Sequence, residues 1–368
     1  MKLFHLADLH LGKRLYGHSL LPDQKYILQQ ITDLASLHRP QAVLIAGDIY
    51  DRAAPPAEAV ELFDSFLSGL EAMGILVFLI SGNHDSGTRL AFGSAILKKQ
   101  GIHMAGHFTG KLTPIPLDGV NIFLLPFVRP GEVRYYLEQE DIVTYHQAVA
   151  GILAQTPVAS GKKNILLTHQ FITGQGSVPL LSQSEISPVG GLDNVDSSVY
   201  DAFDYVACGH LHIPQTIGKK NLRYCGSPLK YSFSEAEKQK SVTVLELHEK
   251  GEIEISLLPL TPLRDMRVIR GPFQELRAAA QPTEDYVKVI LTDFDRVPDP
   301  LSELRKRYPN LLNLTFEQAD TEQPVTVAAP EKQEPLTLFS KFYESQTGKR
   351  LSDPQKKLVK EILENETP

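Results

Sequence analysis

The chain has 368 residues, enough for one large domain or for two to three smaller ones with buried cores. A composition of 42% hydrophobic and 22% charged residues is that of an ordinary globular protein. The sequence has no apolar run of about 18 residues or more and no signal-peptide pattern at its start, which predicts a cytoplasmic protein without membrane spans.

The formal net charge of −7 argues against a surface that follows nucleic-acid phosphates, because such surfaces are usually basic. Bound metal cations or a partner subunit could supply the missing positive charge. The two cysteines, Cys208 and Cys225, have neither metal-binding nor redox spacing, and we expect buried reduced thiols.

In the first two-thirds of the chain, short β-rich runs alternate with helical patterns, which predicts an α/β sandwich. A helix is expected over Pro22–His38, where apolar residues from Ile27 onward recur at helical spacing. An alternating pattern over Ser241–Leu260 predicts a hairpin that turns at residues 249–251. The expected strands are Leu3–Asp8, Ala42–Asp48, Ile75–Ser81, Asn121–Val128, Asn164–His169 and Tyr205–His210.

A different pattern begins near residue 263. Three strands alternate there with two helical segments, which predicts a compact βαβαβ unit as a second, small α+β domain. Its expected elements are Met266–Arg270, Pro272–Ala280, Asp285–Leu291, Pro300–Tyr308 and Leu311–Glu317. A Pro-rich linker and an apolar helical tail follow, so the expected boundaries are 1–262, 263–320, 321–335 and 336–368.

Residues typical of metal sites stand at the ends of five expected strands. Because ligands bind beyond the carboxyl ends of strands in open α/β sheets, these ends should converge. Glycines before Asp48, Asn83 and His210 are expected to allow the turns that aim each side chain at one point. An ordinary polar loop would explain one such pair, but it does not explain ligand residues at five of the six expected strand ends. The ends carry Asp8 and His10; Asp48 and Asp51; Asn83, His84 and Asp85; His169; and His210 and His212.

This ordered set (Asp-x-His, Gly-Asp-x-x-Asp, Gly-Asn-His-Asp, a later His and Gly-His-x-His) resembles the signature of the calcineurin-like metallophosphoesterases. The resemblance implies two β-sheets flanked by helices and a centre with two divalent metal ions. It implies that one metal is bound by Asp8, His10, Asp48 and His212, and the other by Asp48, Asn83, His169 and His210. Asp48 would then bridge the two metals. Oxygen and imidazole ligands suit manganese, iron or zinc, and the absence of thiolates favours manganese, which is the expected metal.

His84 belongs to neither ligand set in the family pattern. Beside Asp85, it is placed to donate a proton to the leaving oxygen or to steady the phosphate, which would make it the catalytic residue. A structural histidine behind the ligands is the alternative. Asp51 and Asp85 are expected to orient the ligands rather than to bind metal.

Further segments are similar to the SbcD nuclease family, and this similarity narrows the range of possible substrates. They are Leu6–Arg14, Asp23–Lys25, Gly82–Ser86, Arg89–Phe92 and Gly226–Glu235, the last being the most specific. Many relatives have Trp between the first Asp and His, where this chain has Leu9.

The family resemblance implies a manganese-dependent nuclease of DNA repair, recombination and replication. Such subunits degrade double-stranded DNA from the 3′ side and cut single-stranded or hairpin DNA. They work as a homodimer joined to a coiled-coil ATPase of the SbcC type, in a heterotetramer. Residues 263–320 would form a capping domain over the metals.

Two other functions stay open. A stand-alone phosphoesterase for a small phosphodiester or phosphomonoester should not need the second domain, the linker and the tail. A scaffold without catalysis would typically have lost metal ligands, and this chain lacks none of the seven.

The dimer surface is expected on the helix Pro56–Met73, whose apolar residues spread over about 160° of the helical wheel, more than one core-facing stripe needs. Burial against a second copy would explain this width, and burial inside one subunit is the alternative. The segment Thr88–Lys99 adds further apolar residues to this surface. The residues expected at the interface are Val60, Phe63, Phe66 and Leu70 on the helix and Phe92 on the added segment.

The tail is expected to bind the ATPase. Its apolar residues fall on two short helices, and isolated helices below about 12–15 residues are marginal in water, so they need another surface. Ser352 can cap the second helix, with Pro354 in its first turn. Phe342, Leu358 and Ile362 are the expected anchors on the partner, and folding back on the body of the chain is the alternative.

Overall fold

The computed structural model describes residues 1–174, 179–185, 194–218, 221–248, 252–278, 283–293, 299–317, 339–340, 343 and 350–365, with side chains up to residue 360. The chain forms two compact units, Met1–Glu317 and Gln318–Pro368. All the expected metal ligands lie in the first unit.

The first sheet contains β1 (Lys2–Leu6), β4 (Ala42–Ala46), β5 (Leu76–Ile80), β6 (Ile102–Ala105), β15 (Ser241–Leu247) and β16 (Ile253–Pro259). Its order is β16-β15-β1-β4-β5-β6. The strands β1, β4, β5 and β6 are parallel, and the expected β15–β16 hairpin is added antiparallel beside β1. The predicted turn of this hairpin at residues 249–251 lies outside the described residues.

The second sheet contains β7 (Ile115–Leu117), β8 (Val120–Leu125), β9 (Lys163–Thr168), β12 (Tyr205–Cys208), β13 (Gln215–Thr216) and β14 (Leu222–Tyr224). Its order is β13-β14-β12-β9-β8-β7, with parallel pairing from β14 to β8 and antiparallel strands at both edges. Two smaller pairs are β2 (Arg14–Leu15) with β3 (His18–Ser19), and β10 (Phe171–Thr173) with β11 (Asn194–Asp196).

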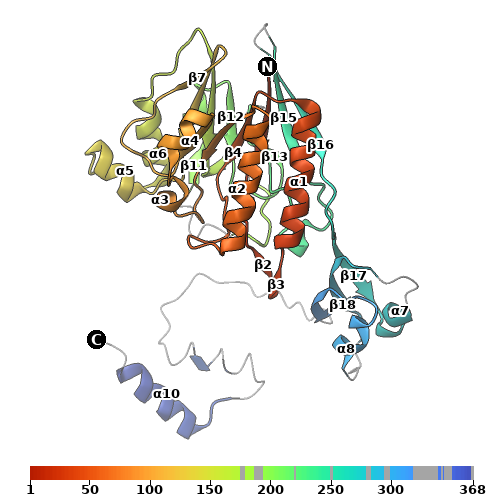
Figure 1. The fold of residues 1–368 in the computed structure, drawn as a ribbon. Helices are drawn as coiled ribbons and strands as arrows, with labels where there is room; N and C mark the ends of the chain where they lie inside the picture. Colours follow the sequence, from red (N-terminus) through yellow and green to blue (C-terminus); the bar gives the residue numbers. More distant parts are fainter. Residues whose placement is uncertain are drawn as a thin grey trace. The chain divides into compact units, whose positions relative to one another are not determined.

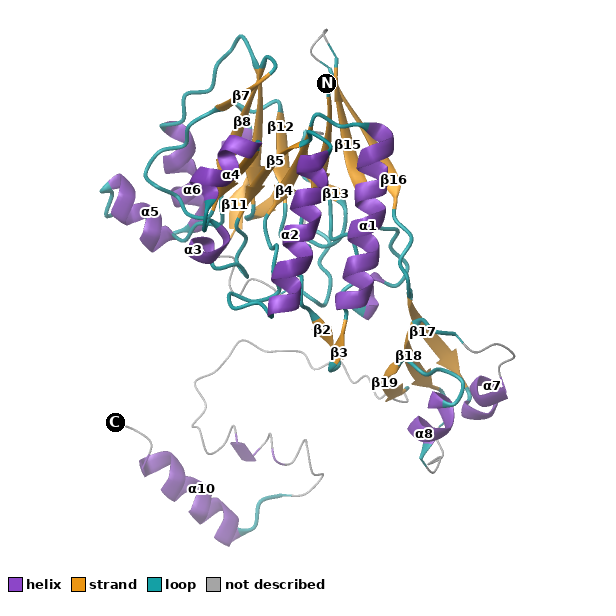
Figure 2. Cartoon of the chain, in the orientation of Figure 1, coloured by secondary structure: helices purple, strands orange, loops and turns teal. Residues whose placement is uncertain are grey.

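Helices cover the outer faces of both sheets (Figures 1 and 2). α1 (Leu21–His38) and α2 (Ala57–Ala72) pack on the first sheet, and α5 (Pro130–Leu137) and α6 (Tyr145–Ala154) pack on the second. The short helices α3 (Gly87–Leu90) and α4 (Ser94–Leu97) follow β5. The predicted α/β sandwich of two sheets flanked by helices is therefore confirmed.

Alternation along the strands explains why the two sheets stack. In β4, Val43 and Ile45 join the core beneath α1 and α2, while Leu44 joins the core between the sheets. In β12, Val206 packs toward α5 and α6, whereas Ala207 faces the first sheet. Successive side chains point to opposite faces of a strand, so an unbroken apolar run gives a sheet two buried faces.

The structure departs from the sequence prediction mainly at strand ends and sheet edges. The first strand ends at Leu6 rather than Asp8, and the second at Ala46 rather than Asp48, because the ligand residues leave the extended conformation. The strands β6, β7, β13 and β14 were not expected, since two to four residues are too few to show alternation. Cys208 and Cys225 are free and buried, as predicted.

A small parallel sheet follows, in the order β17-β18-β19. Its elements are β17 (Met266–Gly271), α7 (Phe273–Ala278), β18 (Tyr286–Leu291), α8 (Pro300–Arg305) and β19 (Leu311–Phe316), in the predicted βαβαβ order. Phe273, Val287, Val289 and Leu304 are buried in a core of its own. The last helix is shorter than predicted, although Tyr308 still packs in this core.

The first turn of α1 contacts the small sheet. The Asp23 carboxylate is buried, and its Oδ2 accepts from Arg264 and from the Tyr286 hydroxyl, each over 2.8 Å. Met266 and Tyr286 also join the core beneath α1. The expected boundary at residues 262 and 263 falls between β16 and β17, inside one compact unit, and separate folding of 263–320 stays a prediction.

The helix α2 corrects part of the dimer prediction. Phe63, Phe66 and Leu70 are buried in this chain's own core, with exposed fractions of 3%, 4% and 0%. The prediction that these three side chains face a second copy is therefore wrong. The helix packs on α1 as well as on the sheet, so it needs a wide apolar stripe within one subunit. Val60 and Phe92 are exposed, and their role at an interface stays a prediction.

In the second unit, α10 spans Asp353–Asn365, where the second tail helix was expected. Ser352 precedes it and donates from its backbone N–H and its hydroxyl to Gln355 Oε1. Leu358 is exposed, whereas Phe342 and the Ile362 side chain lie outside the described residues. Among the helices that the structure describes, none is both long and apolar enough to cross a membrane.

Candidate metal centre

The five predicted strand ends meet at one edge of the two stacked sheets. The loops after β1 and β4 are joined by the Asp8 N–H, which donates to Gly47 O over 3.0 Å. The two sheets are joined where the ring of His169, just after β9, contacts Ala46 O through Nδ1 at 2.7 Å. The His210 N–H, after β12, donates to Asp8 Oδ1 over 2.9 Å. The structure thus brings the predicted ligands from both sheets into one cluster. Asn83 and His210 are partly exposed in it, and the other ligands are buried.

Four of these residues adopt a backbone conformation that L-amino acids rarely take. The φ angles of Asp8, His10, Asp48 and His210 are 55°, 43°, 51° and 102°. Such angles persist only where the surrounding structure enforces them, and they are frequent at functional sites. Here they turn each side chain off the end of its strand and into the cluster.

The glycines beside the ligands mainly allow neighbouring atoms to approach the backbone closely, and to a lesser extent allow tight turns. Only Gly47 among the three has a positive φ, at 89°. A Cβ on Gly82 would lie 2.1 Å from Asp48 Oδ1, and one on Gly209 would lie 1.9 Å from Ala46 O. The predicted reason, a tight turn at each glycine, therefore holds only for Gly47, and the other two make room for backbone and ligand atoms.

One half of the centre is formed by Asp8, His10 and His212, all buried. The ring atoms His10 Nε2 and His212 Nε2 face each other at 3.1 Å. Burial lowers the pKa of His10 to about 3 and that of His212 well below its usual range. Neutral imidazoles with converging nitrogens, beside a carboxylate, form a donor set that fits a divalent cation.

The other half is rich in acceptors. The amide oxygen Asn83 Oδ1 lies 3.1 Å from both His169 Nε2 and His210 Nδ1, and Asp48 Oδ2 lies 3.3 Å from His169 Nε2. Burial alone would lower the pKa of His169, but the Asp48 and Asp8 carboxylates and the Ala46 carbonyl together outweigh burial and raise it to about 9. A pocket that draws a proton onto a buried imidazole also attracts a metal cation, so this half fits a metal as well.

Asp48 lies between the two halves. Its Oδ2 is 3.3 Å from His169 Nε2 on one side and 3.6 Å from His10 Nε2 on the other. Its Oδ1 accepts from the His84 backbone N–H over 2.9 Å, which fixes the carboxylate plane. One oxygen therefore faces histidines of both predicted ligand sets.

His84 stands at the open side of the centre. Its Nδ1 lies 2.9 Å from Asp51 O, an acceptor, so Nδ1 carries the proton and Nε2 points toward Asp48 Oδ2 at 4.0 Å. The side chain is 33% exposed, whereas the rings of His10 and His169 are buried. His84 is thus more accessible to a substrate than His10 and His169 are.

Asp51 and Asp85 contact the loops that carry the ligands. Asp85 accepts backbone N–H groups from Ile49, Tyr50 and Gly82 over 2.9–3.1 Å. Burial and the nearby Asp48 raise the pKa of Asp85 to about 6. Asp51 pairs with Lys13 at 2.7 Å and lies 3.6 Å from His10 Nδ1. These contacts favour the predicted orienting roles.

Sequence reasoning missed several side chains behind the ligands. Gln24 donates to His10 O over 2.7 Å, and the Tyr231 hydroxyl donates to Leu9 O. Both residues stand in segments singled out for their family likeness, which was the available signal. Others contact His212, namely Ser184, Glu185, Glu235 and Lys240. No local pattern marked Ser184 or Glu185, and burial raises the pKa of Glu185 to about 7.

Comparison with known proteins agrees with this geometry. Residues 1–214 match the family model described as calcineurin-like phosphoesterase. Residues 262–347 match a model described as type 5 capsule protein repressor C-terminal domain. The SbcD subunit of the nuclease SbcCD from Staphylococcus epidermidis is 34% identical over 372 residues, covering 99% of this chain and 98% of the relative.

Among solved structures, a dimetal phosphatase from Danio rerio aligns with 71% of this chain and 98% of its own at 13% identity. Its TM-score of 0.38 is too low to bear on function. The family match covers more than half of the chain and the nuclease relative nearly all of it. The chain therefore belongs to the calcineurin-like phosphoesterases, as a hydrolase of the SbcD nuclease subunit family.

Proposed function

We propose that this chain is a manganese-dependent DNA nuclease with two metal ions at the centre described above. The position of Asp48 carries the proposal. Its Oδ2 lies between His169 Nε2 and His10 Nε2, at 3.3 Å and 3.6 Å, as a bridging carboxylate requires. Oxygen and imidazole ligands without thiolate favour manganese.

The proposed ligand sets follow the two halves of the centre. One metal would be held by Asp8, His10, Asp48 and His212, and the other by Asp48, Asn83, His169 and His210. When bound, two such ions supply Lewis acidity to the phosphate and lower the pKa of water at the site. The chain's own contribution is to fix the ligands through backbone contacts of Asp85 and the Lys13–Asp51 pair.

His84 is proposed as the catalytic residue. Its Nδ1–H is engaged by Asp51 O, so a proton carried on Nε2 would face a phosphate at the centre. From there it could pass to the leaving oxygen of the phosphodiester or hydrogen-bond to the phosphate. The exposed position of the ring, beside buried ligands, supports contact with substrate rather than with metal.

The proposed substrate is DNA, cut as a 3′ to 5′ exonuclease on duplex ends and as an endonuclease on single-stranded or hairpin DNA. The likeness to the SbcD subunit of an SbcCD nuclease over nearly the whole chain supports this substrate. It also supports action in a complex with an SbcC-type coiled-coil ATPase, with two copies of this chain, in DNA repair and recombination.

One assay separates this function from hydrolysis of small phosphodiesters. The full chain with manganese is offered a linear duplex, hairpin DNA and bis(p-nitrophenyl) phosphate. We expect cleavage of both DNA substrates, abolished by chelation and restored by manganese. Hydrolysis of the small ester alone, with both DNA substrates intact also after addition of the partner ATPase, would identify a small-molecule phosphoesterase instead.

A further inference from the structure

His212 is held at three atoms by residues outside the ligand-bearing strand ends. Its backbone N–H donates to Glu185 Oε1 over 2.5 Å, and its carbonyl oxygen accepts from Lys240 Nζ over 2.8 Å. Its ring Nδ1 lies 2.8 Å from Ser184 Oγ. Its backbone and its ring are therefore both fixed before any metal binds.

Glu235 stands behind these contacts and is fully buried. Its Oε2 accepts from Lys240 Nζ over 2.5 Å, and its Oε1 accepts from Ser184 Oγ over 3.2 Å. Lys240 Nζ donates its other hydrogens to His212 O and Ser227 Oγ, so all three donors of this buried ammonium are satisfied. The ion pair thus reaches His212 from two sides, through Lys240 to its carbonyl and through Ser184 to its ring.

The direction of these hydrogen bonds selects the tautomer of His212. The Glu235 carboxylate can only accept, so the Ser184 hydroxyl donates to it. The Ser184 oxygen is then free to accept from His212 Nδ1–H, and from the Ser182 hydroxyl 2.6 Å away. With the proton on Nδ1, the lone pair of His212 lies on Nε2, the atom that faces His10 Nε2 at 3.1 Å.

We propose that Glu235, acting through Ser184 and Lys240, positions His212 and keeps its Nε2 unprotonated for a metal ion. Metal-binding histidines generally donate their second N–H to a carboxylate, carbonyl or water, and here a serine relays that contact. The inference rests on the proposed role of His212 as a ligand. The proposal also assigns a structural role to the segment Gly226–Glu235, because Ser227 and Glu235 both belong to this segment and both contact Lys240.

Ser184→Ala tests the relay without disturbing the buried ion pair. In the metal-free full-length protein with ¹⁵N-labelled histidines, we expect the wild-type His212 ring to show the Nδ1–H tautomer. Its signal is identified by its loss in His212→Gln. Ser184→Ala should shift the ring toward a mixture of tautomers, and Ser184→Thr, which keeps a hydroxyl, should restore it. Ser65→Ala, which removes a hydroxyl that donates to Glu61 O on α2, is the matched control.

Manganese titration supplies the second readout. Ser184→Ala should weaken one of the two manganese sites by about 10–100-fold and leave the other unchanged. Glu235→Gln should also weaken that manganese site. Because this variant removes the carboxylate that pairs with Lys240, the Ser184→Ala result is the decisive one. An unchanged tautomer, or unchanged affinity at both sites, in Ser184→Ala would overturn the proposal. Retention of both sites in His212→Gln would instead refute the proposed ligand set, while the tautomer measurement would still judge the relay.

Discussion

At the scale of single residues, the metal centre combines strained backbone conformations with closely spaced hydrogen-bond acceptors. The positive φ angles of Asp8, His10, Asp48 and His210 oppose folding by about 1–3 kcal/mol each, and binding of a cation would offset this strain. The ligand types and their order were readable from sequence, because each follows an apolar strand. The strain and the supports were not, since contacts such as Ser184 to His212 join segments with no common local pattern.

Asp48→Ala should remove both metals, because the carboxylate that faces histidines of both ligand sets is lost. Metal content per chain, measured on protein purified with manganese, should fall from two ions to none. Asp204→Asn, at a carboxylate that pairs with Lys163 away from the centre, is the control and should keep both. Two tightly bound ions in the alanine variant would refute the bridging role.

His84→Gln should reduce turnover on duplex DNA by about 10²–10⁴-fold, the usual contribution of general acid–base catalysis. The glutamine can keep the hydrogen bond to Asp51 O, so we expect the fold and the metal content to be unchanged. Steady-state kinetics with metal analysis of the same sample checks both points. Lost metals, or near-normal turnover, would assign His84 a structural role.

His5 makes stability depend on pH. Burial, followed by the nearby Arg223, lowers its folded-state pKa to about 3, against an unfolded value near 6.5. The unfolded state therefore takes up the proton first, and stability present above pH 6.5 is lost as the pH falls toward 3. In urea unfolding of metal-free protein between these values, His5→Phe should show a shallower pH slope than wild type, by up to about 1.4 kcal/mol per unit. Equal slopes would show that His5 keeps a normal pKa when folded.

At the scale of helices and strands, periodicity was a good guide wherever an element lies in the sheet interior. β4 and β12 were found because both their faces are buried and their runs are continuously apolar. The edge strands β7 and β13 were missed, since their pairing depends on a neighbouring strand and not on their own pattern. The wide apolar stripe of α2 was assigned to a dimer surface for a similar reason. Its width is explained by packing on the neighbouring helix α1, which the pattern of α2 itself does not reveal.

The predicted dimer surface is best probed at residues that the structure exposes. Phe92 is 87% exposed and is the better probe, whereas Phe66 is 4% exposed and belongs to the core. Phe92→Glu should convert the dimer to a folded monomer in light scattering, with little change in unfolding midpoint. Leu37→Glu, at a similarly exposed position on α1, should stay dimeric. A Phe92→Glu variant that also stays dimeric would place the interface elsewhere.

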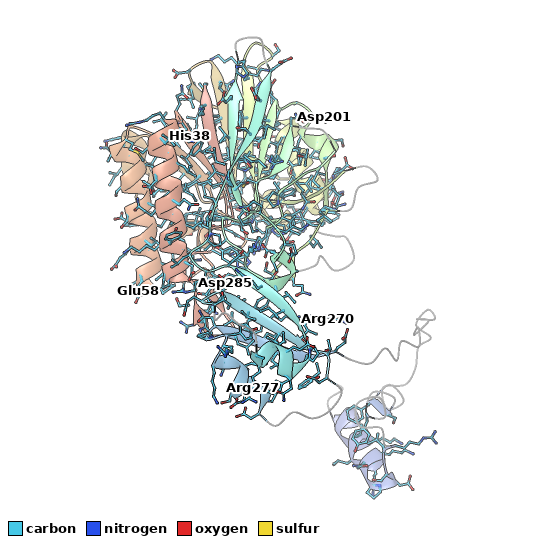
Figure 3. The ribbon with its side chains drawn as sticks, turned by 90° about the vertical axis from the view of Figure 1, so that its right-hand side faces the viewer. His38, Glu58, Asp201, Arg270, Arg277 and Asp285 are labelled. Carbon is cyan, nitrogen blue, oxygen red and sulfur yellow. The ribbon has the colours of Figure 1, made fainter. Side chains whose placement is uncertain are left out.

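At the scale of the whole molecule, the acidic net charge is not offset by a basic surplus in the described residues around the small sheet, where basic and acidic side chains are equal in number. Figure 3 shows Arg270, Arg277 and Asp285 on this part of the chain. Three exposed arginines pair with carboxylates: Arg267 with Asp285, Arg270 with Glu317 and Arg277 with Glu303. Arg305 and Arg307 are also exposed. These pairs reduce the positive potential that this part of the chain offers to phosphates, so we expect DNA binding to depend also on the bound metals or on a partner protein.

The tail is the predicted binding site for such a partner. α10 belongs to a unit separate from residues 1–317, and Leu358 on it is exposed, so an apolar contact is available. Deletion of residues 336–368 should abolish co-purification with the partner ATPase and leave manganese-dependent hydrolysis of bis(p-nitrophenyl) phosphate intact. The point variant Leu358→Ser should weaken binding, whereas Lys357→Ser, exposed on the same helix, should not, because burial of an apolar side chain contributes about 1.5–3 kcal/mol. Undiminished binding of the truncated chain would show that the ATPase docks on residues 1–335.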